Sequence, residues 1–302
     1  MSDIRANEPA GATVAFSEIN EALEQGGDRG TAHARALMAT VVAVGPAERL
    51  SETEEALQHL ASDCAIRAIM ISQGAVPAPP AKVSGQIVGL AGLKPQYVDN
   101  AVAALRLSSL PTLVWFRGGS QDLLGELAQL ADRVVLDEID PLASWKQSLT
   151  LLDRTAFSDL RWARLTRWRT LMAHFFDIPR VRHVARSFTH LHISGSDGAA
   201  ANLYAAWLTT SLSQPIDVEL AIASGRAPIE KVRLGDTDRS LTLRLGRSKH
   251  CVHTAMVVDS DQRSSRIASL GDQRLPALMA EELRIRSRDT AFERAVASVV
   301  TP

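Results

Sequence analysis

The chain has 302 residues, of which 46% are hydrophobic, 22% charged and 5% aromatic, a composition typical of globular proteins rather than disordered, collagenous or disulfide-scaffolded ones. Its 33 Lys and Arg residues are balanced by 34 Asp and Glu residues, so the formal net charge is -1. This balance argues against nucleic acid or an anionic membrane as the main partner, because such binding depends on many uncompensated cations.

Cysteine usage and the apolar runs indicate the compartment. The two cysteines, Cys64 and Cys251, lie far apart and form no CxxC spacing, so neither a disulfide framework nor a thiol-based zinc site is expected. The N-terminus lacks the basic and apolar blocks of a signal peptide. No uncharged run reaches the roughly 18 residues that a membrane span needs. These features predict a cytoplasmic protein of two domains.

The first half of the chain alternates between strand and helix patterns after a tail at residues 1–15 that we expect to be disordered. The expected strands are 36–44, 66–72, 112–116 and 134–136, with an extended segment at 83–90. The expected helices are a short one starting at Phe16, then 51–60, 98–107, 121–131 and one beginning near Pro141. Strands and helices in alternation predict an α/β domain over residues 16–155, with a mostly parallel sheet flanked by helices.

The second half, residues 156–302, has a different order of elements. A strand at 188–193 and a helix at 199–212 precede four strand candidates at 218–223, 229–234, 241–245 and 252–258, and helices at 275–285 and 290–299 follow. Consecutive strands joined by short polar turns favour antiparallel pairing. The sequence therefore predicts an α+β C-terminal domain with antiparallel strands.

Residues 156–180 form an Arg/Trp-rich segment at the expected domain junction. Apolar residues at helical spacing from Leu165 predict an amphipathic helix with Thr166 as its N-cap. Arg and Trp together are typical of protein interfaces and also suit stacking on nucleic acid bases. We interpret the apolar face of the helix as part of the core and the arginines as a protein interface or domain junction. Binding of nucleic acid is the least favoured of the three interpretations. The candidate residues are Arg161, Trp162, Arg164, Thr166, Trp168 and Arg169.

A second candidate site is the turn Gly118, Gly119 and Ser120, which follows an expected strand and opens an expected helix. Free backbone N–H groups at such a position can bind an anion. The turn matches neither GxGxxG nor GxxxxGK[ST], so helix capping is the favoured interpretation. The similar turn at 194–198 contains Asp197, whose carboxylate stands where a phosphate would lie, and capping is favoured there more strongly.

Other chemistry-bearing residues form weak patterns. His190 and His192 share one face of a strand, as metal ligands can, and His183, His250 or His253 would have to add a third ligand. The carboxylate pairs Asp236/Asp238 and Asp259/Asp261 lie in expected turns, where Asp binds its own backbone. No GxSxG motif is present. The sequence predicts no catalytic residue, cofactor or resident metal.

Several segments together resemble the OpcA family of glucose-6-phosphate dehydrogenase assembly proteins. The most specific is Asp159-Leu-Arg-Trp-Ala-Arg-Leu-Thr-Arg-Trp-Arg169, followed by Phe175-Phe176-Asp177, which is similar to that family's D-L-x-W-x-R-L-T-P-W-R block and the F-x-D after it. Leu110-Pro-Thr-Leu-Val-Trp-Phe116, Tyr204-Ala-Ala-Trp-Leu208 and Cys64-Ala-Ile-Arg67 resemble three further family segments.

The resemblance implies a non-catalytic accessory protein that binds glucose-6-phosphate dehydrogenase and promotes its active oligomer in the oxidative pentose phosphate pathway. Arg167 departs from the family's Pro at the expected first helical position. The chain also lacks the close cysteine pair that a thiol switch would require. The alternative is a regulatory module that binds a sugar phosphate or nucleotide at Gly118–Ser120, and a metal-dependent enzyme using His190 and His192 is a third class.

Overall fold

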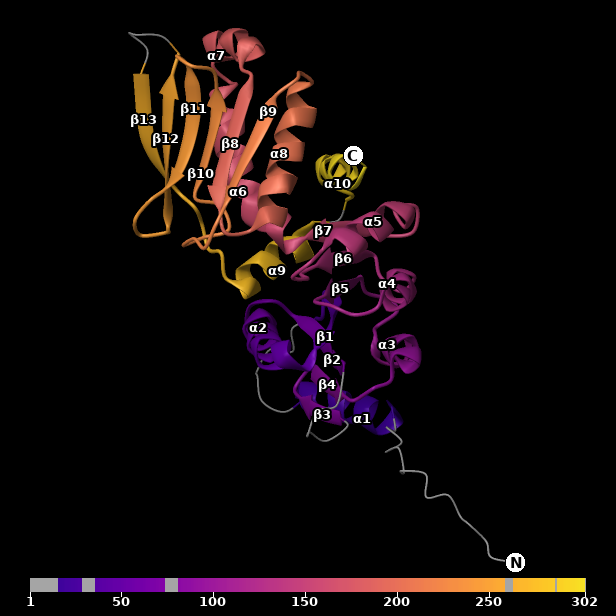
Figure 1. The fold of residues 1–302 in the computed structure, drawn as a ribbon. Coiled ribbons are helices and arrows are strands. Elements are labelled where there is room, and N and C mark those ends of the chain that lie inside the picture. Colours follow the sequence, from indigo (N-terminus) through magenta and orange to yellow (C-terminus); the bar gives the residue numbers. More distant parts are fainter. Residues whose placement is uncertain (1–15, 29–35, 74–80, 259–262, 286, 302) are drawn as a thin grey trace, which may run out of the picture. The chain divides into compact units, whose positions relative to one another are not determined.

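The computed structural model describes residues 16–28, 36–73, 81–258, 263–285 and 287–301 (Figure 1). The chain forms two compact units, Met1–Thr112 and Leu113–Pro302. The tail expected to be disordered, residues 1–15, lies outside the described residues. The predicted domain boundary at 155/156 falls inside the second unit and stays a prediction.

The first unit is built on β1 (Ala39–Pro46) and β2 (Ile66–Gln73), which pair in parallel. The first six residues of β1 are all buried, which accounts for its continuous apolar sequence. β2 also pairs in parallel with β4 (Ile87–Ala91), while β3 (Ala81–Ser84) pairs antiparallel with β4. The helices of this unit are α1 (Phe16–Asp28), α2 (Leu50–Asp63) and α3 (Val98–Leu105), with short 3-10 turns at Ala47–Arg49 and Pro95–Tyr97.

Three parallel strands follow in the order β5 (Thr112–Phe116), β6 (Arg133–Leu136) and β7 (Ala156–Asp159). α4 (Gln121–Ala128) and α5 (Leu142–Thr150) connect them. Every residue of the three strands is buried. Their carboxyl ends lead into the loop after β5, the loop after β6 and the start of α6 (Leu160–Phe175).

The C-terminal part of the second unit contains a six-stranded sheet in the order β13-β12-β11-β10-β8-β9 (Figure 1). Its strands are β8 (His190–Gly195), β9 (Asp217–Ile222), β10 (Lys231–Gly235), β11 (Ser240–Leu245), β12 (Cys251–Val257) and β13 (Arg263–Ser269). β8 and β9 are parallel, and the other neighbours are antiparallel.

One face of this sheet is covered by helices. α6 and α8 (Gly198–Leu212) contact each other, and each also contacts strands of the sheet. Leu241, Leu243 and Leu245 of β11 are buried, whereas the alternating residues Thr242 and Arg244 are not. This alternation is the pattern of a sheet with one covered and one solvated face. The remaining helices are α7 (Pro179–Val184), a 3-10 turn at Ala185–Ser187, α9 (Leu275–Arg284) and α10 (Thr290–Val300).

The predicted fold class is confirmed: mostly parallel strands with flanking helices precede a mostly antiparallel sheet. One pairing was wrong, because the expected strand at 218–223 does not pair with the strand that follows it. It forms β9, which lies parallel to β8 because α8 carries the chain back across the sheet. β7, α7 and β13 are additional elements; β13 has a polar sequence because nearly all its residues are exposed at the sheet edge.

Within the described residues, no helix combines the length and the apolarity that crossing a bilayer requires.

Candidate functional site

The Arg/Trp-rich segment forms α6, and its first turn is set by Asp159. This residue ends β7 with extended backbone angles, and its Oδ1 accepts a hydrogen bond from the backbone N–H of Arg161 at 2.7 Å. The prediction that the helix starts at Leu165 with Thr166 as N-cap is therefore wrong. Thr166 lies in the helix interior, exposed, with its hydroxyl directed at the carbonyl of Trp162. Likewise Arg167 is not at the helix start and donates to the Ser269 carbonyl.

Asp159 is fully buried, and burial raises its pKa to about 6. The indole N–H of Trp145 donates to its Oδ2 at 2.9 Å, and the guanidinium of Arg161 lies 3.7 Å from its Oδ1. These partners favour the charged form but only partly offset the desolvation. The contacts of Asp159 with Trp145 and Arg161 hold the chain in place where β7 ends and α6 begins.

Arg161 links three segments of the second unit. Its Nε donates to Asp197 Oδ2 at 2.9 Å, and its Nη2 donates to the Ile139 carbonyl at 2.9 Å. Asp197 is in turn the N-cap of α8, since its Oδ1 accepts from the backbone N–H of Ala200 at 3.0 Å. One guanidinium thus joins the loop after β6, the start of α6 and the start of α8.

Trp162 and Arg169 form a second internal cluster. Trp162 is 2% exposed, and its indole N–H donates to Asp289 Oδ2 at 2.7 Å. The Arg169 guanidinium lies 3.4 Å from the centre of the Trp162 ring, and Phe292 packs against that ring at 5.7 Å. Burial lowers the Arg169 pKa to about 10, so the side chain remains charged at neutral pH. Asp289 also caps α10, so this cluster fastens α10 to α6.

Trp168 and Arg164 face a cavity. Trp168 is 4% exposed, and its carbonyl accepts a hydrogen bond from the Tyr204 hydroxyl at 3.4 Å. Arg164 is half-buried and, within the described part of the chain, has neither a hydrogen bond nor an ion pair. Of the six candidate residues, all except Arg164 therefore have internal hydrogen bonds or ring contacts.

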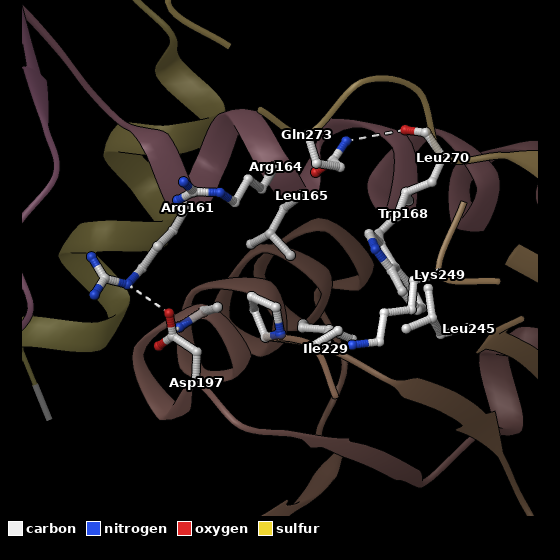
Figure 2. Close-up of a pocket in the computed structure, with 13 residues that line it drawn as sticks. Arg161, Arg164, Leu165, Trp168, Asp197, Ile229, Leu245, Lys249, Leu270 and Gln273 are labelled. Carbon is white, nitrogen blue, oxygen red and sulfur yellow. Dashed lines mark hydrogen bonds and ion pairs between the residues drawn. The ribbon is translucent and has the colours of Figure 1, made fainter. Parts of the chain in front are cut away.

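The cavity has a volume of about 290 Å³ and is lined by five separate segments of the second unit (Figure 2). They are α6, the start of α8, residues 227–229, the β11–β12 turn and residues 270–273. Its walls are mainly apolar, and Arg161, Arg164 and Lys249 are its cations. Figure 2 shows the Arg164 side chain directed toward the end where Arg161 and Asp197 pair. Sequence reasoning missed this cavity, because its residues meet only in the tertiary structure.

Gly118, Gly119 and Ser120 have the local structure expected of a cap. The Ser120 hydroxyl accepts from the backbone N–H of Leu123 at 3.2 Å and caps α4. Gly118 and Gly119 have φ values of 144° and 154°, a region that residues with a side chain rarely adopt. The capping interpretation is confirmed here and at Asp197.

The His and Asp candidates serve local contacts. His192 Nδ1 lies 3.1 Å from Glu219 Oε2, and His190 contacts Thr189. Asp236 accepts from the backbone N–H groups of Asp238 and Arg239, as expected of a turn residue. Asp259 and Asp261 lie outside the described residues. In the described ranges, no group of three or more His, Cys, Asp and Glu is arranged to hold a metal ion.

Comparison with known proteins identifies the last half of the chain. Residues 155–296 match the family model for the C-terminal domain of the glucose-6-phosphate dehydrogenase subunit OpcA. These residues are similar to the OpcA C-terminal domain. The matched region contains all of α6, α8 and the residues that line the cavity. The OpcA resemblance noted in the sequence is therefore confirmed over residues 155–296, whereas the segments at 64–67 and 110–116 lie outside the match.

Two solved structures are similar to the chain at low sequence identity. Aldose-aldose oxidoreductase from Caulobacter crescentus, complexed with glycerol, is 9% identical with a TM-score of 0.51, covering 86% of this chain and 95% of that one. The super-repressor mutant of Gal80p from Saccharomyces cerevisiae is 8% identical with a TM-score of 0.46, covering 82% and 83%. At this identity, the similarity to the oxidoreductase concerns the fold alone. No curated protein matches the chain by sequence.

Proposed function

We propose that this chain is a non-catalytic accessory protein that binds glucose-6-phosphate dehydrogenase and promotes its assembly into the active oligomer. The observation that carries the proposal is the match of residues 155–296 to the OpcA domain. The chain would act in the cytoplasm, in the oxidative pentose phosphate pathway. Its near-zero net charge of -1 favours a protein partner over nucleic acid or a membrane surface.

The polar groups of the Arg/Trp segment support a structural rather than a catalytic role. Asp159 caps α6, Arg161 joins three segments, and Arg169 stacks on Trp162. Each of these groups is held by internal partners, whereas a catalytic acid or base must reach a substrate. We infer that α6 braces the C-terminal part of the chain, which presents the docking surface for the dehydrogenase.

An assembly factor must bind the active form of its partner more tightly than the inactive form, because equal affinity for both shifts nothing. A tenfold shift toward the oligomer requires only about 1.4 kcal/mol of preference. A rigid protein suits this task, since a surface that orders only on binding loses part of its affinity to that ordering. The hydrogen bonds that join α6 to its neighbours support such rigidity in the C-terminal part of the chain.

The test uses the full chain with glucose-6-phosphate dehydrogenase from the same organism. Light scattering after size-exclusion chromatography measures oligomer size, and the rate of substrate oxidation measures activity, both with and without the chain. We expect co-elution, a larger dehydrogenase species and a higher rate. A serum albumin control separates specific effects from protein crowding. No co-elution, with oligomer size and rate unchanged, would contradict the proposal.

A further inference from the structure

The cavity beside α6 carries an unbalanced positive charge. Asp197 is the only carboxylate among its lining residues, and it already accepts from Arg161 and from the backbone N–H of Ala200. Arg161 is therefore neutralised by its partner. The side chains of Arg164 and Lys249 have no hydrogen-bond or ion-pair partner among the residues that the structure describes. The cavity is therefore lined by two cations without a carboxylate partner among its lining residues: Arg164, which is half-buried, and Lys249, which is exposed.

The backbone holds Lys249 in an unusual conformation at the cavity. Its φ is 60°, in the left-handed region that residues other than glycine rarely adopt. Its backbone N–H donates to the Gly246 carbonyl at 3.1 Å, which closes the turn between β11 and β12. Figure 2 shows the Lys249 side chain extending across the cavity toward Ile229. Strained backbone of this kind is concentrated at binding and active sites.

Most of the remaining cavity wall is formed by apolar side chains. Leu165, Trp168, Ile229 and Leu245 are each at most 4% exposed, and all four line the cavity. These walls offer few partners to the hydroxyl groups of a sugar, and a buried polar group without a partner is costly. A volume of about 290 Å³ lies at the lower end of the range for small-molecule sites, roughly 300–1,000 Å³.

The geometry points to a binding site for a small amphipathic anion. The ligand carries one carboxylate or phosphate group, attracted by the positive charges of Arg164 and Lys249, on an apolar or aromatic body that packs between Trp168, Leu165 and Ile229. This site is distinct from the turn Gly118–Ser120. It also stands independently of dehydrogenase binding, because every residue that forms it lies in this chain.

Titration calorimetry on the purified full chain tests the site with simple probes. Phenyl phosphate and 3-phenylpropionate share the predicted chemistry, with different anionic groups. We expect both to bind with a Kd of about 1 mM. Benzyl alcohol lacks the charge, inorganic phosphate lacks the apolar body, and glucose 6-phosphate carries hydroxyl groups instead. We expect each of these three to bind at least about tenfold more weakly.

Substitutions locate the site and separate charge from folding. Arg164→Gln should weaken phenyl phosphate binding about tenfold. Lys249→Gly should weaken it similarly while the thermal unfolding midpoint holds or rises, because glycine suits the positive φ. Arg244→Gln, an exposed arginine of β11 that does not line the cavity, should bind like the unchanged chain.

Three results would overturn the inference. One is that neither amphipathic anion binds at about 10 mM. Another is that benzyl alcohol binds as tightly as phenyl phosphate, which removes any role for the cations. The third is that Arg164→Gln and Lys249→Gly both keep full affinity, which places the probe elsewhere. Because these titrations contain no dehydrogenase, their outcome is separate from that of the assembly test.

Discussion

Replacing Trp162 by Phe tests whether α6 acts as a brace. The substitution keeps an aromatic ring beside Phe292 but removes the indole N–H that donates to Asp289 at 2.7 Å. Asp289 retains the two backbone donors, Ala291 and Phe292, that make it the N-cap of α10. Its Oδ2, however, loses the Trp162 hydrogen bond.

The expected loss follows from two contacts. A buried hydrogen bond to a charged group contributes about 1.5–3 kcal/mol to stability. The Arg169 guanidinium, 3.4 Å above the Trp162 ring, also meets a weaker π face in Phe, which adds up to about 1 kcal/mol. We therefore expect the free energy of unfolding to fall by about 1.5–4 kcal/mol.

Urea unfolding followed by circular dichroism measures this change, and an unaltered m value keeps the comparison valid. Trp207→Phe is the matched control, because Trp207 is half-buried on α8 and its main aromatic contact is Tyr204. This control should lose less than about 1 kcal/mol.

The same variant separates bracing from docking. If α6 is a brace, the folded Trp162→Phe protein still binds glucose-6-phosphate dehydrogenase at temperatures well below its unfolding transition. A loss of stability below about 0.5 kcal/mol would refute the brace. Dehydrogenase binding abolished in a fully folded variant would instead make Trp162 a docking residue.

Two further predictions concern buried charges. The Asp159 pKa of about 6 means that the folded chain holds this proton more tightly than the unfolded chain, so Asp159 lowers the free energy of unfolding by about 3 kcal/mol as pH rises from about 4 to 6. Asp159→Asn should remove this dependence while keeping the cap, and a pH-independent stability difference between the two proteins in urea titrations would contradict it. Glu282→Gln should cost about 3–5 kcal/mol, because Arg133, whose Nη2 lies 2.8 Å from Glu282 Oε2 and which is buried with it, loses its counter-charge. Arg133→Met in addition should recover most of that loss in the same assay, and no recovery would show that the ion pair is not the cause.

The positions of most strands and helices follow from the sequence because their signals are local. Residues 112–116 form a strand with the predicted bounds, since five buried residues, four of them apolar, follow Pro111 and precede Gly118. The capping role of Ser120 was also predictable, because the acceptor and its N–H donor lie three residues apart. The pattern failed at β13, whose exposed edge residues carry no apolar alternation.

The start of α6 shows where local signals compete. Thr166 and Asp159 are both good N-cap types, and the apolar spacing was clear only from Leu165 onward. Asp159 is the N-cap of α6 because β7 ends at this residue and because Trp145, 14 residues away, donates a hydrogen bond to the same carboxylate. Arg161 and Trp162, in the first turn, contact partners that the sequence did not indicate.

The sequence by itself determined the order of most elements, the change from mostly parallel to mostly antiparallel strands, and the OpcA block. Only the tertiary structure decided what the Arg/Trp block touches. Trp162 meets Asp289 across 127 residues, and Arg161 meets Asp197 across 36. Arg164 and Lys249 likewise line the same cavity although they lie far apart in the sequence. Periodicity and capping act over a few residues, whereas such pairings depend on how packed layers bring remote segments together.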